Sequence, residues 1–166
     1  MHFKIHKEGW VYFIFFIILT FILIPFYPFV SFIFLFISLY IYYFFRDPER
    51  SIPIDDIIIS PADGIITSIS NSKNYDFIDD LNEYTKISIF LNIFNVHVNR
   101  LPTSGVIKEV KYFHGKFINA TLNKSSKHNE RNILCIEKKN KDIVYVTQIA
   151  GLIARRIICE VKKDQI

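Results

Sequence analysis

The sequence has few of the residues that usually mark a cofactor or metal site. It contains only five glycines and two cysteines among its 166 residues. The glycines are scattered, which excludes a glycine-rich loop that could cradle a phosphate. Cys135 and Cys159 lie too far apart for a metal-binding pair, so we interpret them as small buried hydrophobic residues in a reducing compartment. The sequence also has no cluster of metal ligands, so no metal is expected, and no internal repeat.

Charged residues are absent from a long stretch near the N-terminus, residues 10–45. This stretch is too long and too apolar for a signal peptide. As one helix it would exceed the apolar core of a bilayer, which is roughly 30 Å thick. Pro25 and Pro28 should interrupt the helix, so we expect two helices, at residues 10–24 and 29–45.

Positive charges flank this apolar stretch on both sides: Lys4 and Lys7 precede it, and Arg46 and Arg50 follow it. Such charges favour the cytoplasmic side of a membrane. We therefore predict a membrane-anchoring hairpin over residues 1–45 at the cytoplasmic face of the cell membrane, with a single tilted span as the alternative. The two arginines form either a charged collar beside the membrane or a binding site for lipid headgroups.

The overall charge is weakly positive, with a formal value of +4. This excess is too small to indicate nucleic-acid binding, and no basic surface interleaved with aromatic residues is evident. It is compatible with an anionic membrane surface, where each nearby Lys or Arg contributes about 1 kcal/mol.

Residues 46–166 contain many short apolar segments separated by turn residues, and no long amphipathic helix. This pattern predicts a mainly β soluble domain, a β-sandwich or a partly open barrel, preceded by the helical membrane hairpin. A β-hairpin is expected from residues 132–138 and 142–149, and a last strand at residues 151–159.

Residues 86–102 combine a predicted strand with a group of polar side chains. Apolar residues alternate along its first half, as in a strand with one buried face. They are Ile87, Ile89, Leu91 and Ile93. His97 and Arg100 follow, before Pro102 ends the strand. A titratable imidazole at a strand end is a candidate general base; a buried structural histidine is the alternative.

Two other polar positions stand out. Asp63 lies in a turn before Gly64, where an aspartate usually only caps the backbone. Arg155 and Arg156 interrupt an apolar run. An inward-facing arginine needs an anionic partner; otherwise one of the pair faces solvent and the other snorkels. His114, beside Gly115, is interpreted as a surface turn residue.

Five sequence motifs occur here in the order and at the spacing found in phosphatidylserine decarboxylases. They are SPADG at 60–64, FNVHVNRLP at 94–102, the run at 112–121, NER at 129–131 and QIAGLIARRI at 148–157. Over essentially its whole length the chain resembles the short bacterial and archaeal-type members of this family.

The resemblance implies a lyase of phospholipid biosynthesis. Members of the family are membrane-bound proenzymes that cut themselves at a Gly-Ser bond, and the serine becomes a pyruvoyl group on a small subunit. That group forms a Schiff base with phosphatidylserine, CO2 leaves, and phosphatidylethanolamine is released. The implied cofactor is thus the pyruvoyl group. The implied partners are phosphatidylserine in the bilayer and the small subunit, and a homo-oligomer is a further expectation.

The resemblance also assigns roles to residues. His97 maps onto the histidine that handles protons, and Asp63 onto the aspartate that accompanies it. Such roles agree with general chemistry, since serine needs a base and an imidazole needs a carboxylate to fix its tautomer. Arg100, Arg155 and Arg156 are candidates for binding the anionic phosphodiester and carboxylate of the substrate.

The sequence departs from the family in one respect: none of its glycines is followed by serine, so the pyruvoyl precursor is missing. Three interpretations remain. The chain is a fragment or frameshifted reading frame of a proenzyme, a large subunit with a separately encoded partner, or a catalytically inactive, membrane-anchored lipid-binding remnant. We favour the first, because a processed large subunit should end at the cleavage glycine. It predicts a Gly-Ser motif encoded downstream of Ile166.

Overall fold

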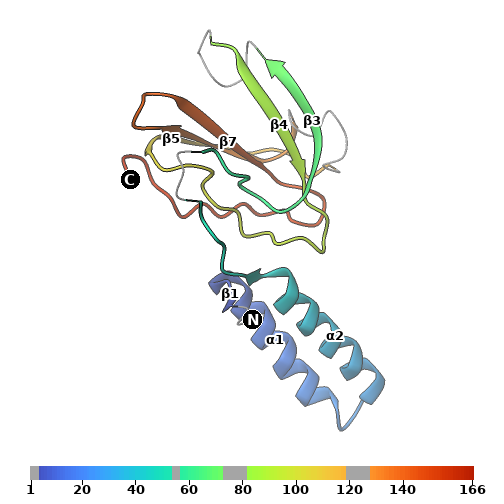
Figure 1. Cartoon of the computed structure of the whole chain (residues 1–166). Helices are drawn as coiled ribbons and strands as arrows, with labels where there is room; N and C mark the ends of the chain where they lie inside the picture. Colours follow the sequence, from blue (N-terminus) through green and yellow to red (C-terminus); the bar gives the residue numbers. More distant parts are fainter. Residues whose placement is uncertain (1–3, 54–56, 73–81, 119–127) are drawn as a thin grey trace. The chain divides into compact units, whose positions relative to one another are not determined.

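The computed structural model describes residues 4–53, 57–72, 82–118 and 128–166. The chain divides into two compact units (Figure 1). The first unit comprises Met1–Ile54 and Ala62–Asn99, and the second unit comprises Asp55–Pro61 and Arg100–Ile166.

The first unit begins with a helical hairpin formed by α1 (Lys7–Leu23) and α2 (Pro28–Phe44). Pro28 occupies the start of α2, where a helix needs no N–H donor. At the base of the hairpin, β1 (Lys4–Ile5) pairs with β2 (Arg46–Asp47). Gly9 allows the start of α1 to lie close to Phe45, because a Cβ added at Gly9 would lie 2.5 Å from Cβ of Phe45.

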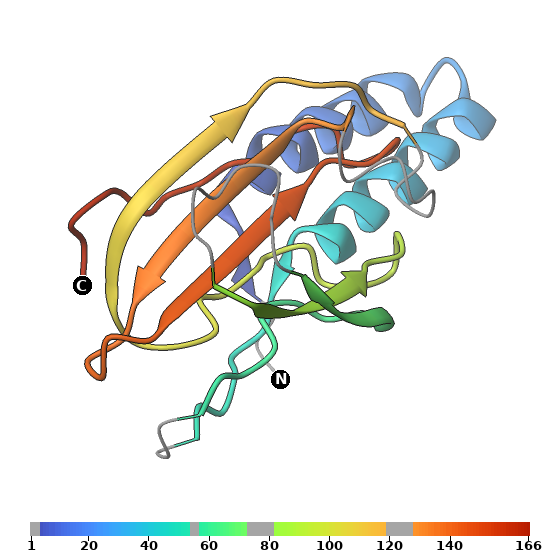
Figure 2. The same ribbon diagram turned by 90° about the horizontal axis from the view of Figure 1, so that it is seen from above.

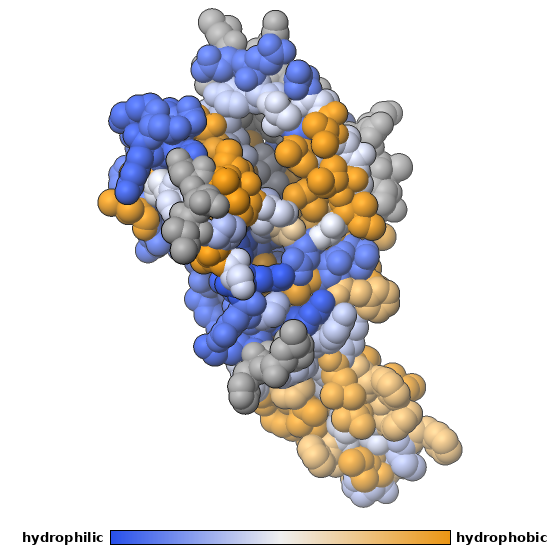
Figure 3. Space-filling model, viewed as in Figure 1, coloured by the Kyte–Doolittle hydropathy of each residue, from blue (hydrophilic) through white to orange (hydrophobic). Residues whose placement is uncertain are grey.

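The two helices lie close to their predicted positions, but the prediction of a membrane hairpin is wrong. Each helix has 17 residues and is therefore about 26 Å long, short of the roughly 30 Å core of a bilayer. Within the described ranges, no helix has both the length and the apolar character needed to cross a membrane. The break between the helices, where Pro25 lies, is the physical reason. Many of their apolar side chains are nevertheless exposed (Figure 3).

The first unit also contains an antiparallel pair, β3 (Ile65–Ser72) and β4 (Tyr84–Phe90). Ile69 lies opposite Ile87, and these side chains are 64% and 55% exposed. The face predicted to be buried is therefore largely open in this structure, because a pair of strands cannot cover its own face. The strand also ends at Phe90, earlier than the alternating pattern indicated.

The second unit contains a three-stranded antiparallel sheet in the order β5-β6-β7 (Figure 2). Its strands are β5 (Val106–Phe113), β6 (Arg131–Glu137) and β7 (Ile143–Ile149). The central strand supplies most of the buried apolar side chains of this sheet, including Ile136, which is 0% exposed.

The predicted hairpin over residues 132–149 is confirmed by the pairing of β6 with β7. The strand predicted at residues 151–159 does not form, and these residues are irregular. The fold class is therefore corrected. In place of a sandwich or barrel preceded by a membrane hairpin, the described residues show a helical hairpin and separate sheets of two, two and three strands.

Candidate active site

His97 lies in an irregular segment that follows β4 in the first unit. Two asparagines build the turn that precedes it. The Asn92 backbone N–H donates to Oδ1 of Asn95 over 2.8 Å, and the Phe94 N–H donates to Oδ1 of Asn92 over 2.8 Å. Such side-chain bonds to the backbone replace those of the strand. Val96, which lies between Asn95 and His97, is only 3% exposed, so its buried side chain anchors the segment.

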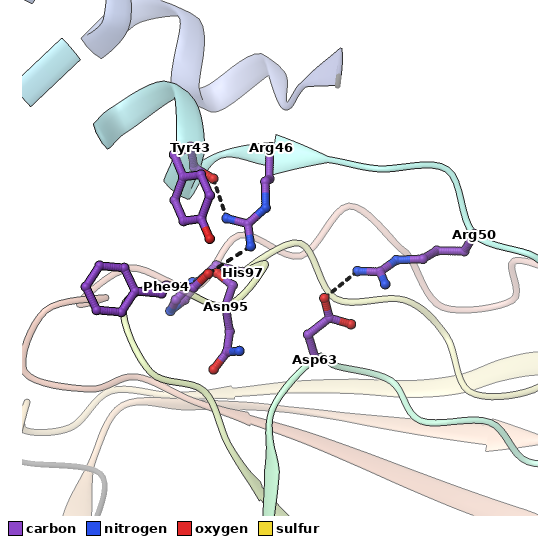
Figure 4. A network of polar contacts seen from close by, with 7 residues as sticks. All are labelled: Tyr43, Arg46, Arg50, Asp63, Phe94, Asn95 and His97. Carbon is purple, nitrogen blue, oxygen red and sulfur yellow. Dashed lines mark hydrogen bonds and ion pairs between the residues drawn. The ribbon is translucent and has the colours of Figure 1, made fainter. Parts of the chain in front are cut away.

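Polar groups from the C-terminal end of α2 and from β2 contact this turn (Figure 4). The hydroxyl of Tyr40 donates to the carbonyl of Ile93 over 3.1 Å. The guanidinium of Arg46 donates to the carbonyl of Phe94 over 2.8 Å and to the carbonyl of Tyr43 over 2.7 Å. The same guanidinium lies 3.8 Å from the centre of the Tyr43 ring, a cation–π contact.

The imidazole of His97 is held by a stacked ring and a hydrogen bond. Its ring lies 4.1 Å from that of Phe44, centre to centre, with 25° between the planes. Its Nδ1 lies 3.0 Å from the carbonyl oxygen of Asn95. A carbonyl can only accept, so Nδ1 carries the proton in the neutral ring and Nε2 carries the lone pair.

The surroundings of His97 favour the neutral ring. Burial lowers its pKa from the ordinary value, and the positive charge of Arg46 lowers it further, while the bond to the Asn95 carbonyl acts in the opposite direction. The ring is therefore a base at neutral pH, with its free lone pair at Nε2.

Asp63 lies in the bend before β3, and its partner is Arg50. The Arg50 Nη2 donates to the carboxylate over 2.6 Å, and both side chains are about two-fifths exposed, at 41% and 38%. The next residue, Gly64, packs against the end of β4, because an added Cβ would lie 2.5 Å from the carbonyl oxygen of Phe90. A glycine is therefore needed for the turn to approach the strand.

The predicted pairing of Asp63 with His97 stays a prediction. Both belong to the first unit. In the described part of the chain no hydrogen bond joins them, and the carboxylate is turned toward Arg50 (Figure 4). The backbone of Asn95 fixes the tautomer of His97 here.

The three arginines predicted to bind substrate belong to the second unit. The backbone N–H of Arg100 donates to the carbonyl of Pro61 over 2.9 Å, and Nε of Arg155 donates to the carbonyl of Leu152 over 2.9 Å. All three side chains are exposed, so neither Arg155 nor Arg156 is the buried cation that the sequence raised as an alternative. Their role in binding stays a prediction.

The residues that hold His97 were missed by sequence reasoning. Phe44 carried no signal beyond membership of an apolar run, and Arg46 was noted only as a collar or headgroup-binding residue. The contact between Arg46 and Phe94 spans 48 residues of sequence, and no local pattern marks such a pair.

Comparison with known proteins shows which family the chain belongs to. The family model for phosphatidylserine decarboxylase matches residues 37–166. The phosphatidylserine decarboxylase proenzyme of Pelagibacter ubique is 46% identical over an alignment of 166 residues that covers 98% of this chain and 76% of that protein. The proenzymes of Ehrlichia chaffeensis and Rickettsia typhi are 50% and 44% identical over 98% and 96% of this chain, and 72% and 70% of their own lengths.

These matches place the chain among the lyases. It belongs to the phosphatidylserine decarboxylase family. The family membership expected from the five motifs is thereby confirmed. The chain spans about three quarters of the length of these relatives, between 70% and 76%.

Proposed function

We propose that the chain is the large-subunit part of a phosphatidylserine decarboxylase, which converts phosphatidylserine to phosphatidylethanolamine and CO2. One structural observation carries the proposal. His97, in the family motif, is held as a neutral ring with its lone pair at Nε2. A base of this kind can accept the proton of a serine during self-processing, and in its protonated form it can deliver a proton to carbon.

His97 has two tasks in this proposal. During maturation its Nε2 accepts the proton of the serine hydroxyl, which is otherwise a poor nucleophile. During turnover the same atom, once it has taken a proton from solvent, delivers that proton to the carbon that has lost CO2 and becomes neutral again. A pyruvoyl group, supplied with the small subunit, provides the electron sink for that loss. The neutral ring of His97 is consistent with formation of a pyruvoyl group from a serine, because a cationic ring could not accept the proton of the serine hydroxyl.

Asp63 is proposed to stabilise the protonated form of His97. This requires the carboxylate to leave Arg50. Because both side chains of that ion pair are about two-fifths exposed, at 41% and 38%, the pair contributes only about 0.2–1 kcal/mol. Moving the Asp63 carboxylate from Arg50 to His97 therefore costs little free energy compared with what the carboxylate gains by stabilising the half-buried imidazolium.

The exposed arginines are proposed to bind the anionic parts of the substrate. Arg100, Arg155 and Arg156 provide planar guanidinium groups, which suit phosphodiester and carboxylate oxygens. We further propose that the protein works at the cytoplasmic face of the cell membrane, where it takes phosphatidylserine from the bilayer surface, and that it assembles with a pyruvoyl-bearing small subunit and into homo-oligomers.

The test provides the chain with the portion of a relative's proenzyme that the chain does not match. The chain is co-expressed with the remaining portion of the Pelagibacter ubique proenzyme, and CO2 release is measured from vesicles of carboxyl-labelled phosphatidylserine. We expect release by the wild-type chain and a loss of roughly 10²–10⁴-fold in His97→Ala. His114→Ala, whose side chain is 92% exposed, is the matched control and should keep full activity.

Two outcomes would contradict the proposal. If an assembled wild-type complex releases no CO2 but binds the vesicles, the chain is the inactive lipid-binding remnant. If His97→Ala matures and turns over normally, His97 is not the base.

A further inference from the structure

His97 and the turn before it are contacted at three positions by residues from the C-terminal end of α2 and from β2, which follows it. Tyr40 bonds the carbonyl of Ile93, Arg46 bonds the carbonyl of Phe94, and Phe44 stacks on the ring of His97. All these residues lie in the first unit. Three separate contacts to a five-residue segment leave it little freedom to rotate relative to the helix.

Two of these contacts together determine where Nε2 points. The stack on Phe44 fixes the plane of the imidazole, and the bond from Nδ1 to the Asn95 carbonyl fixes its rotation within that plane. Arg46 acts one step away, since it holds the carbonyl of Phe94, the residue next to Asn95. A base that must meet a proton within hydrogen-bonding distance depends on this kind of fixed direction.

Arg46 is itself held in place. Its backbone pairs with Ile5 in the β1–β2 ladder, and its guanidinium donates to the Tyr43 carbonyl and lies over the Tyr43 ring. Two of its N–H groups are thus committed to backbone carbonyls. This commitment favours a structural role over the binding of lipid headgroups that the sequence left open.

We propose that Phe44 and Arg46 are positioning residues for His97: they hold the imidazole so that Nε2 faces the reacting groups. The inference rests on the proposed function for the meaning of that orientation, but the contacts themselves are independent of it. Arg46 is the charged group that acts on the pKa of His97, and Arg50 and Asp63 form an ion pair in the same unit.

The first test follows the His97 ring directly, by a pH titration of its NMR signals in the full chain. In Phe44→Leu the ring loses its stacked cover, and in Arg46→Gln it loses the adjacent charge. Both variants should raise the pKa of His97 toward the ordinary value of about 6.5. The conservative variants Phe44→Tyr and Arg46→Lys should titrate close to wild type. Phe29→Leu, at an 88% exposed position on α2, is the matched control and should change nothing.

The second test uses the co-expressed complex described above. Phe44→Leu and Arg46→Gln should lower kcat with little change in KM, because they disturb the base and not the binding of substrate. If circular dichroism shows that Phe44→Leu is unfolded, both tests are made with Arg46→Gln alone.

The two tests separate failure of this inference from failure of the proposed function. An unchanged His97 titration in both variants overturns the positioning role, even in an active enzyme. A shifted titration in a chain that never releases CO2 supports the positioning role and rejects the decarboxylase function.

Discussion

Tyr112 carries a hydrogen bond that changes its acidity. Its hydroxyl donates to the carboxylate of Glu130, and this bond, with the charge of Glu130, raises the pKa of Tyr112 to about 12. A tyrosine whose folded pKa lies above its unfolded value of about 10 stabilises the fold below pH 10. That contribution is lost as the pH rises from 10 through 12.

We predict that Glu130→Gln brings the pKa of Tyr112 back toward 10. The neutral amide removes the charge that opposes formation of tyrosinate. The measurement is an alkaline titration of tyrosinate absorbance, with Tyr112→Phe identifying the contribution of this residue. Glu109→Gln, at an exposed carboxylate on β5, is the control. An unchanged Tyr112 titration in Glu130→Gln would show that the hydrogen bond has no such effect.

Individual site residues were predictable only where a local pattern marks them. His97 follows an alternating apolar run and was a candidate base from its position. The pattern at Asp63 indicated only a backbone cap, and its proposed role came from the resemblance to the family. Phe44 lies within an apolar run of many aromatic residues, and nothing distinguishes it from its neighbours. Its contact with His97 depends on tertiary packing, which one sequence does not show.

At the level of elements, Asn129 joins segments that are distant in sequence. Its side chain is 0% exposed. It accepts from the N–H of Ile118 over 2.9 Å and donates to the carbonyls of Ile118 and Ala150 over 2.7 and 2.8 Å. These bonds connect the segment before β6 to the segment after β5 and to the residue after β7.

We therefore predict that Asn129→Ala destabilises the chain by about 2–4 kcal/mol, because it leaves buried backbone groups without partners. Urea unfolding followed by circular dichroism measures this change. Asn140→Ala, in the exposed turn between β6 and β7, removes an asparagine of no comparable burial and should change stability far less. Equal stability of the two variants would count against the role of Asn129.

Elements were predicted well where strong breakers bound them. Prolines mark the end of α1 and the start of α2, and the polar turn at residues 139–141 separates the strands of the β6–β7 hairpin. The strand predicted over residues 151–159 failed because the backbone turns on itself. The Gly151 N–H donates to the Ala154 carbonyl, and Arg155 donates to the Leu152 carbonyl. An apolar run becomes a strand only where a neighbouring strand accepts its backbone bonds.

For the whole molecule, the formal charge of +4 bears on where the protein works. We predict that the chain adsorbs to vesicles containing phosphatidylserine more strongly than to phosphatidylcholine vesicles, and that added salt weakens this binding. Each Lys or Arg near an anionic surface contributes about 1 kcal/mol, and salt screens that attraction. Co-sedimentation at low and high ionic strength measures both effects. Binding that is equal for the two kinds of vesicle and unchanged by salt would contradict an electrostatic contribution.

The contacts of α2 and β2 with the His97 turn join segments that are made at different times during synthesis. The helix leaves the ribosome before the turn does, and the Arg46–Phe94 contact closes a loop of 48 residues. Closing such a loop costs conformational entropy, which is recovered only when the surrounding structure packs. A nascent or misfolded chain would therefore carry an imidazole without a fixed direction, and under the proposed function His97 would act as a base only after this part of the chain has folded.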